Sequence, residues 1–372
     1  MTEPRQSGHH RRIWQIAAVL GILAWPAAGQ DAASQIKAEA QRLERSLKAK
    51  PITDPDFPNA NSMIEGDLKA VAEALSAGSL YLSLERLGRA SDFLQGARTA
   101  AGEKAEVVKG GLPAFESRWE KASLKLAALD RQAREQDWSN VRAAIRALSE
   151  TAQVKARPLL EGGQGFATST QPKDGLFYLG QAQGEAGFAR FCAALKLPLE
   201  APAFPARSML PELRNLQDKT NAAFQPPRSI NLHARFIALN STLKLAHELD
   251  AAKFYAGALY QYLEAVRHYG MLDAAPVDAA GQLQLKSALA AANRKVESSG
   301  RDDSMARLFL ERAASQMAHA DGSAPSVDEW SSARVILDRV LPAYYAALEA
   351  PSPLRPASGK TVDITLVRWP YT

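Results

Sequence analysis

The stretch AGSLYLSLE at residues 77–85 returns 179 positions later as AGALYQYLE at residues 256–264. Both copies lie in segments whose apolar residues recur every three or four positions, which is the spacing of an amphipathic helix. DWSNVRAAI at 137–145 and EWSSARVIL at 329–337 form a second matching pair in the same order, 192 positions apart. Two matches in one order predict an internal duplication, with an inserted loop accounting for the longer second offset. Chance similarity within an alanine-rich helical chain is the alternative.

The helical period continues through almost all of the chain, so we expect an all-α fold. Helices that each expose an apolar face bury it by stacking, which predicts antiparallel helical hairpins arranged as a bundle or a short α-superhelix. We divide the chain into six segments: a signal peptide, an amphipathic helix with a linker, a first helical half, a middle segment punctuated by glycine and proline, a second helical half, and a tether with a strand. In that order, their bounds are residues 1–29, 30–61, 62–160, 161–228, 229–350 and 351–372.

Local signals mark several helix boundaries. Ser62 with Glu65 has the three-residue spacing of a capping box, and so does Ser326 with Glu329. In a capping box each side chain bonds the backbone N–H of the other residue, so both pairs predict the start of a helix. The glycine-rich stretch at 161–172 predicts an interruption between the halves.

The first thirty residues have the order of a secretory signal peptide. Arg5, Arg11 and Arg12 precede an apolar run at 13–25, and small residues follow it. We expect cleavage before Gln30 and export to the periplasm or the extracellular space. An uncleaved leader acting as an anchor is the alternative. The apolar run would rise only about 20 Å as a helix against a hydrocarbon core of roughly 30 Å, so no stable membrane span is expected after cleavage.

Charge and cysteine content limit the classes of partner. Removing residues 1–29 takes away three arginines and one glutamate, so the net charge falls from +5 to +3. Lys and Arg are scattered among Asp and Glu without a basic block, and nucleic acid is therefore not an expected partner. Cys192 is the only cysteine and has apolar neighbours, so it forms no intramolecular disulfide and is expected to be buried.

Three short strings imitate catalytic motifs without completing them. HELDA at 247–251 lacks the second histidine of a zinc protease helix, because Ala251 stands in its place. GKT at 359–361 lacks the earlier glycine of a phosphate-binding loop. STLK at 241–244 has the spacing of a serine nucleophile and a lysine base, but the helical pattern offers no large sheet for such a site to face. We expect a solvated helix surface there.

Histidines give no metal-binding pattern either. The mature chain contains His233, His247, His268 and His319, and the sequence has no cluster of Asp, His and Cys for a metal. We therefore assign no catalytic residue, no cofactor and no metal site.

The carboxyl-terminal tail breaks the helical rule. After a proline-rich tether, Val362, Ile364 and Leu366 alternate at period two and predict one short β-strand that ends near Trp369 and Tyr371. A lone strand leaves backbone groups unpaired, so it must pair with an extended segment of its own chain or with an edge strand of another protein. The second alternative makes this tail a candidate partner-binding site.

Together these features favour an exported, non-enzymatic helical scaffold that binds an envelope protein or a small ligand. The alternative is an exported all-helical hydrolase or lyase that acts on a polysaccharide. A catalytic cleft of that kind should be rich in aromatic side chains and converging carboxylates. Aromatic residues are 7% of this chain, and most fall at core spacing.

Overall fold

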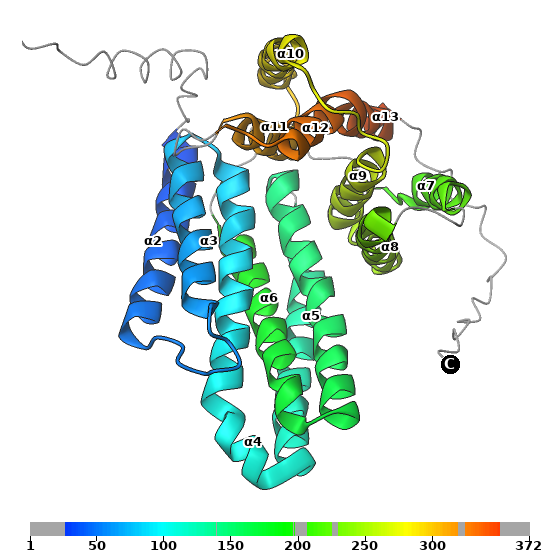
Figure 1. The fold of residues 1–372 in the computed structure, drawn as a ribbon. Helices are drawn as coiled ribbons and strands as arrows, with labels where there is room; N and C mark the ends of the chain where they lie inside the picture. Colours follow the sequence, from blue (N-terminus) through cyan, green and yellow to red (C-terminus); the bar gives the residue numbers. More distant parts are fainter. Residues whose placement is uncertain are drawn as a thin grey trace, which may run out of the picture.

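The structure is a computed structural model that describes residues 27–138, 140–195, 197, 207–224, 230–318 and 324–349. This part of the chain is predominantly helical, which confirms the all-α prediction. The first helices are α2 (Ala27–Ala49), α3 (Ala60–Ser76), α4 (Leu80–Glu135), α5 (Ala143–Ser169), the short 3₁₀ helix η1 (Pro172–Gly175) and α6 (Leu176–Ala194). They run side by side as an elongated bundle (Figure 1). The predicted tail strand lies outside the described residues.

The remaining helices pack across one end of this bundle (Figure 1). They are α7 (Leu210–Ala223), α8 (Ile230–Ala251), α9 (Tyr255–Gly270), α10 (Ala279–Glu297), α11 (Ser304–Met317), α12 (Val327–Val335), the π-helical turn η2 (Ile336–Val340) and α13 (Leu341–Glu349). Contacts of α9 and α8 with α5, and of α11 with α4 and α5, join the two groups. None of the helices in the described ranges combines the length and apolar character needed to cross a membrane.

Helix α4 is folded back on itself at Gly111. This glycine has φ +63°, a conformation that costs a residue with a side chain more than it costs glycine. Pro113 follows directly, where the missing N–H of a proline is tolerated at a helix start. We call residues 80–110 the first arm and residues 112–135 the second arm. Arg118 of the second arm donates to Glu103 of the first at 2.5 Å, so the arms run antiparallel.

Glycines in α6 allow it to lie unusually close to the first arm of α4. A Cβ atom on Gly180 would lie 2.5 Å from the Gln95 carbonyl oxygen, and one on Gly184 would lie 2.5 Å from the Asp92 Cα. Both neighbours are backbone atoms, which cannot rotate away as a side chain would. These two glycines therefore set the distance between the helices, and even alanine would force them apart.

The interruption predicted at 161–172 lies at the end of this stretch, between Ser169, where α5 ends, and Pro172, where η1 begins. Helix α5 continues through this stretch to Ser169. Gly163 instead allows a close contact, because a Cβ on it would lie 3.0 Å from the carbonyl oxygen of Gly175 at the start of α6. Gly163 therefore serves helix packing, and the break in the chain comes after the glycines.

One of the two predicted capping boxes forms. Ser326 and Glu329 bond each other's backbone N–H groups at the start of α12, as predicted. The Ser62 hydroxyl instead donates to the Asn59 carbonyl at 2.9 Å, because α3 already begins at Ala60. Ser62 therefore lies inside the first turn and not at the cap, so the prediction for Ser62 and Glu65 was wrong.

Two buried glutamates cap helices of the opposite group. The Leu82 N–H, on the third residue of α4, donates to Glu311 of α11 at 2.8 Å. The Gly257 N–H, on the third residue of α9, donates to Glu150 of α5 at 2.7 Å. Glu150 and Glu311 are each the eighth residue of their helices. A carboxyl oxygen accepts from N–H groups that a helix start leaves open, so the two contacts join the groups reciprocally.

The start of α5 is also completed from the other group. The Ala143 N–H donates to the Asp302 carboxylate at 2.6 Å, and the Ala144 N–H donates to the Ser304 hydroxyl at 3.0 Å. All four residues are buried. Three helix starts, those of α4, α5 and α9, therefore depend on side chains from distant parts of the sequence.

Arg312 of α11 lies at the centre of the junction. Its guanidinium bonds Glu85 of α4 and Glu264 of α9, which are the last matched residues of the repeated stretch. The Tyr260 hydroxyl also donates to Glu85, at 2.8 Å. Burial alone would raise the pKa of Glu264, but Arg312 and Arg267 outweigh it and lower that pKa to about 2. The repeated sequence thus supplies both carboxylates of one buried ion cluster.

The repeated residues do not occupy the same place in their helices. Tyr81 is the second residue of α4, whereas Tyr260 is the sixth residue of α9, one helical turn later. Trp138 precedes α5 and lies beside Arg146, whereas Trp330 is buried inside α12 beside Lys286. The tryptophan match therefore joins positions with different neighbours.

Candidate functional site

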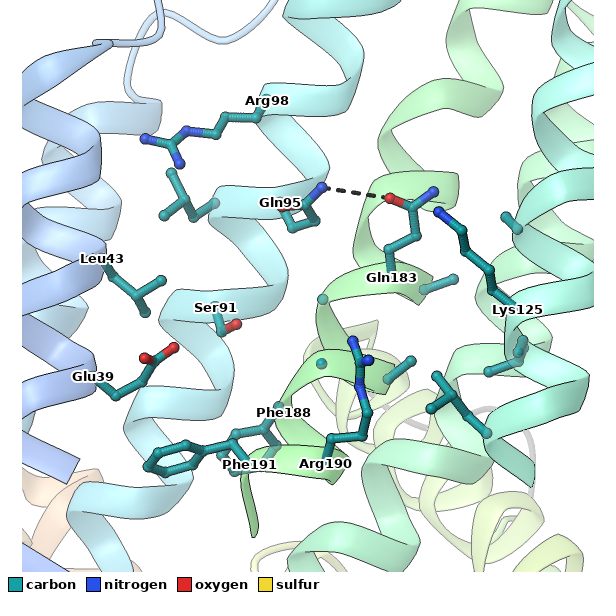
Figure 2. A pocket seen from close by; sticks show the side chains of 18 of the residues that line it. Glu39, Leu43, Ser91, Gln95, Arg98, Lys125, Gln183, Phe188, Arg190 and Phe191 are labelled. Atoms are coloured by element: carbon teal, nitrogen blue, oxygen red, sulfur yellow. Dashed lines mark hydrogen bonds between the residues drawn. The ribbon is translucent and has the colours of Figure 1, made fainter. Parts of the chain in front are cut away.

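A groove of about 930 Å³ runs along the side of the bundle. Its walls are α2, the first arm of α4, the second arm of α4, and α6. Figure 2 shows side chains from these elements around the same space. We call it the α4–α6 groove.

The groove follows from the features that shape α4 and α6. The fold at Gly111 brings the second arm of α4 back beside α6, and the glycines of α6 hold that helix against the first arm. Helix α2 packs on α3 and α4. Side chains of α2 and of the second arm thus line opposite sides of the α4–α6 groove. The first arm and α6 form its floor.

Apolar and polar side chains share the lining of the groove. Leu87 and Leu94 come from the first arm, Leu126 from the second, and Phe188 and Phe191 from α6. Of these, Leu87, Leu94, Leu126 and Phe188 are buried in the chain. An apolar surface of this kind can bind the apolar part of a ligand.

Positive charge surrounds this apolar floor. The charged residues that line the groove are one carboxylate, Glu39, and four cationic side chains, Arg42, Arg98, Lys125 and Arg190. Glu39 is already paired with Arg42, whose Nη2 lies 2.6 Å from its Oε1. The groove therefore keeps three cationic side chains that have no carboxylate partner within it, one on each helical segment except α2.

Arg98 is held in place by only one of its three nitrogens. Its Nη1 donates to the Ser46 hydroxyl at 2.7 Å, while Nε and Nη2 are buried and have no partner among the described residues. Burial lowers the pKa of Arg98, and repulsion from Arg42 lowers it further. Nε and Nη2 form the edge of a guanidinium that binds a carboxylate with two parallel hydrogen bonds. A carboxylate would supply the acceptors that this edge lacks.

Lys125 and Arg190 are the other unpaired cations of the groove. Lys125 projects from the second arm and Arg190 from α6, and neither has a hydrogen bond or an ion pair with any residue that the structure describes. Between them and Arg98, the Gln95 amide donates to the Gln183 amide oxygen at 3.5 Å, as Figure 2 shows. Cations without an ion pair thus stand on three of the four helical segments, around a polar centre.

A second cavity of about 380 Å³ shares part of this lining. Leu126, Leu129 and Arg190 belong to both, and the smaller cavity extends to Trp138 and Gln153. Arg190 therefore lies where the two spaces meet. The lining of the second cavity adds an aromatic ring and amides but no further charge.

The chain also holds a buried pair of carboxyl groups, in Asp92 and Glu185. Burial raises the pKa of Asp92 to about 6 and that of Glu185 to about 7, although Lys155 lowers both. The Lys155 amine lies 3.9 Å from Glu185. Perturbed carboxyl groups of this kind are candidates for acid–base catalysis when they face a cleft. A third, smaller cavity lies beside Arg142. Asp92 and Glu185 line none of the three cavities.

The residues singled out in the sequence lie elsewhere. The tail residues Val362, Ile364, Leu366, Trp369 and Tyr371 are outside the described residues, as are GKT at 359–361 and His319. Ser241 and Lys244 lie exposed on α8, where Lys244 pairs with Glu248 at 3.9 Å, so the expected solvated surface is confirmed. Cys192 is buried as predicted.

The histidines of the described segments lie apart in α8 and α9. His233 is exposed, while His247 and His268 are half-buried. Burial lowers the pKa of both half-buried rings. Within the described ranges, no three His, Cys, Asp or Glu side chains converge as metal ligands would.

The sequence contained a signal for the groove that our predictions did not use. Leu87, Ser91, Leu94 and Arg98 follow the four- and three-residue steps of one helix face. An arginine on such a face is unusual, because charged residues are seldom buried without a partner. Comparison with protein-family models, curated proteins and solved structures gives no match to the chain.

Proposed function

We propose that the mature chain is an exported, non-enzymatic helical binding protein of the cell envelope that holds an anionic, partly apolar ligand in the α4–α6 groove. The observation that carries this proposal is the set of three cations, Arg98, Lys125 and Arg190, which line the groove and have no ion pair among the described residues. Unpaired donors of this kind favour a ligand that brings negative charge.

The positions of the carboxyl groups favour binding over catalysis. The one carboxylate of the groove, Glu39, is engaged by Arg42. The carboxyl groups with pKa values raised toward neutrality, Asp92 and Glu185, lie outside the groove lining. Hydrolysis or cleavage of a polysaccharide needs acid and base groups within reach of the bond that breaks. The polysaccharide alternative therefore has less support.

The export part of the proposal predicts the mature amino terminus. Protein recovered from the envelope or the medium is expected to begin at Gln30, because the apolar run at 13–25 ends shortly before small residues. Cleavage there removes only the first three residues of α2. Amino-terminal sequencing measures this directly, and an intact leader in the membrane fraction would favour the anchored alternative.

The binding part predicts a charge-dependent site. 8-Anilinonaphthalene-1-sulfonate, an anionic aromatic dye, is expected to bind the wild-type protein. A variant with Arg98→Glu, Lys125→Glu and Arg190→Glu should bind it at least tenfold more weakly, because the cations are replaced by groups that repel the sulfonate. Dye fluorescence in a titration at low salt measures the dissociation constants.

A matched variant separates local from overall charge in this experiment. Lys109, Lys219 and Arg294 are exposed, form no ion pair with the described residues and do not line the described cavities. Reversing these three charges changes the net charge equally and is expected to leave dye binding within about twofold. Equal losses in the two variants would contradict a site in the groove.

We also propose that the two helical groups arose by duplication, in a register that differs from the repeated stretch. The reciprocal caps support this, since the capped residues are third in α4 and α9 and the capping glutamates are eighth in α5 and α11. Arg146 and Arg307 each precede these glutamates by four residues. Superposition of α3, the first arm of α4 and α5 on α8, α9 and α11 in an experimental structure tests the proposal.

The tail stays a candidate for a second contact. The alternating residues Val362, Ile364 and Leu366 support pairing with an extended segment, in the same chain or in a partner.

A further inference from the structure

We infer that the occupant of the α4–α6 groove is an acidic amphipathic helix of a partner protein. This inference rests on the proposed function, since it names the kind of ligand that the same groove receives. It draws on three features: the helical faces that form the groove, the hydrogen-bonding state of their backbones, and the charges around them.

The faces that line the groove have the spacing with which helices pack on helices. The residues are Leu87, Ser91, Leu94 and Arg98 on the first arm of α4, and Leu126 and Leu129 on the second arm. Steps of three and four residues place them on one side of each helix, as in a coiled-coil seam. Small residues of α6, such as Gly187, leave room for a backbone to approach. An added helix would continue the bundle at this position.

The backbone of the walls argues against an extended peptide. The groove is lined by helices, whose N–H and C=O groups are bonded within each helix except near its ends. A strand lying in the groove would find no sheet edge to pair with, and its own backbone groups would lose water without gaining partners. A helix satisfies those groups internally and can bury an apolar face at no such cost.

Charge complementarity selects the partner. Arg98, Lys125 and Arg190 favour negative charge on the occupant. The two end segments outside the described residues, 1–26 and 350–372, each carry a net charge of +2, so they do not suit the groove. Arg98 makes the requirement specific, because its free Nε and Nη2 edge matches an Asp or Glu carboxylate. The occupant is therefore an acidic helix that does not come from these ends of the chain.

A displayed peptide library tests this inference. The library consists of 21-residue peptides with leucine fixed at the first and fourth positions of each heptad and with Asp, Glu, Asn, Gln, Lys and Arg allowed elsewhere. Selection on the wild-type protein, with counter-selection on the Arg98→Glu, Lys125→Glu, Arg190→Glu variant, is expected to enrich acidic sequences. Enrichment of neutral or basic sequences, or of none, would overturn the inference.

Fluorescence anisotropy with the leading peptide then separates charge from helical shape. A version with every Asp and Glu changed to Lys, and a version with proline in its central heptad, are both expected to bind at least tenfold more weakly. The triple charge-reversal variant should instead prefer the lysine version. The Lys109→Glu, Lys219→Glu, Arg294→Glu variant should bind the leading peptide as the wild type does.

The outcomes distinguish this inference from the proposed function. If the anionic dye binds in the groove but no acidic peptide is enriched, or if the proline version binds as well as its parent, the groove takes anions but not a helix. The inference then fails while the proposed function stands. If neither dye nor peptide binding depends on Arg98, Lys125 and Arg190, both fail.

Discussion

Replacing Arg312 with methionine is expected to lower the free energy of unfolding by about 3–5 kcal/mol. Methionine fills a similar space but leaves Glu85 and Glu264 without their shared cation. Glu264 is the more affected, because its side chain is only 10% exposed and Arg312 is the chief group that keeps its pKa low. Burial then favours the protonated form, and the junction between the helical groups loses its central contact. Urea unfolding at pH 7, followed by circular dichroism, measures the loss.

Two control variants show whether the loss comes from unpaired charge. Adding Glu85→Gln and Glu264→Gln to Arg312→Met removes the buried charges and is expected to recover at least half of the lost stability. Arg157→Met breaks an ion pair with Asp130 in which the arginine side chain is 64% exposed, so its effect should stay below about 1 kcal/mol. A loss of similar size in Arg312→Met and Arg157→Met would contradict the assigned role of the cluster.

Replacing Glu311 with glutamine is expected to stabilise the protein at pH 8 and to have little effect at pH 5. Burial raises the pKa of Glu311 to about 8, although the Leu82 N–H and Arg307 lower it in part. Its Oε1 is buried and has no partner among the described residues. The folded protein therefore keeps a proton on Glu311 up to about pH 8, while the unfolded chain releases it near the ordinary pKa of about 4.5.

The sign of the pH dependence follows from this difference. Between about pH 4.5 and pH 8 the folded state binds one proton more than the unfolded state, so stability falls as pH rises. Glutamine cannot ionise and can still accept from the Leu82 N–H. At pH 8 the variant is expected to be more stable by on the order of 4 kcal/mol, given about 1.36 kcal/mol for each unit of pKa shift.

Denaturant unfolding at several pH values between 5 and 8.5 measures this effect. Glu65→Gln on the exposed face of α3 serves as the matched control and should run parallel to the wild type. A Glu311→Gln variant that is less stable than wild type at pH 8 would mean that an ionised carboxylate caps α4. The pKa assigned to Glu311 would then be wrong.

Helical periodicity predicted the fold class because it is a local property of the sequence. The stripe of Ile36, Leu43 and Leu47 on α2 is buried, as such a stripe predicts. The glycines of the stretch at 161–172 were mistaken for the break itself because glycine marks both loops and close helix contacts, and only the position of a second helix tells them apart. Gly163 meets its neighbour at Gly175, and no local pattern reveals that pairing.

The candidate groove could not be predicted from the sequence for a related reason. Arg98, Lys125 and Arg190 are far apart in the chain, and they converge only because α4 folds back at Gly111 and α6 packs closely on its first arm. Each cation alone is an ordinary helix residue. The repeated stretch contains both glutamates that bind Arg312, Glu85 and Glu264. The repeat alone does not show which helix supplies the arginine.

The helix caps have a consequence for the order in which the chain acquires its structure. The Leu82 N–H bonds Glu311, which follows 229 residues later in the chain. The Ala143 N–H bonds Asp302, which follows 159 residues later. While the chain is being synthesised, α4 and α5 can form, but their first N–H groups stay bonded to water. Closing loops of this length slows folding, because entropy is lost before the contact is gained. Most of the polypeptide must therefore be present before its earliest long helices are finished, which favours folding after synthesis over folding during it.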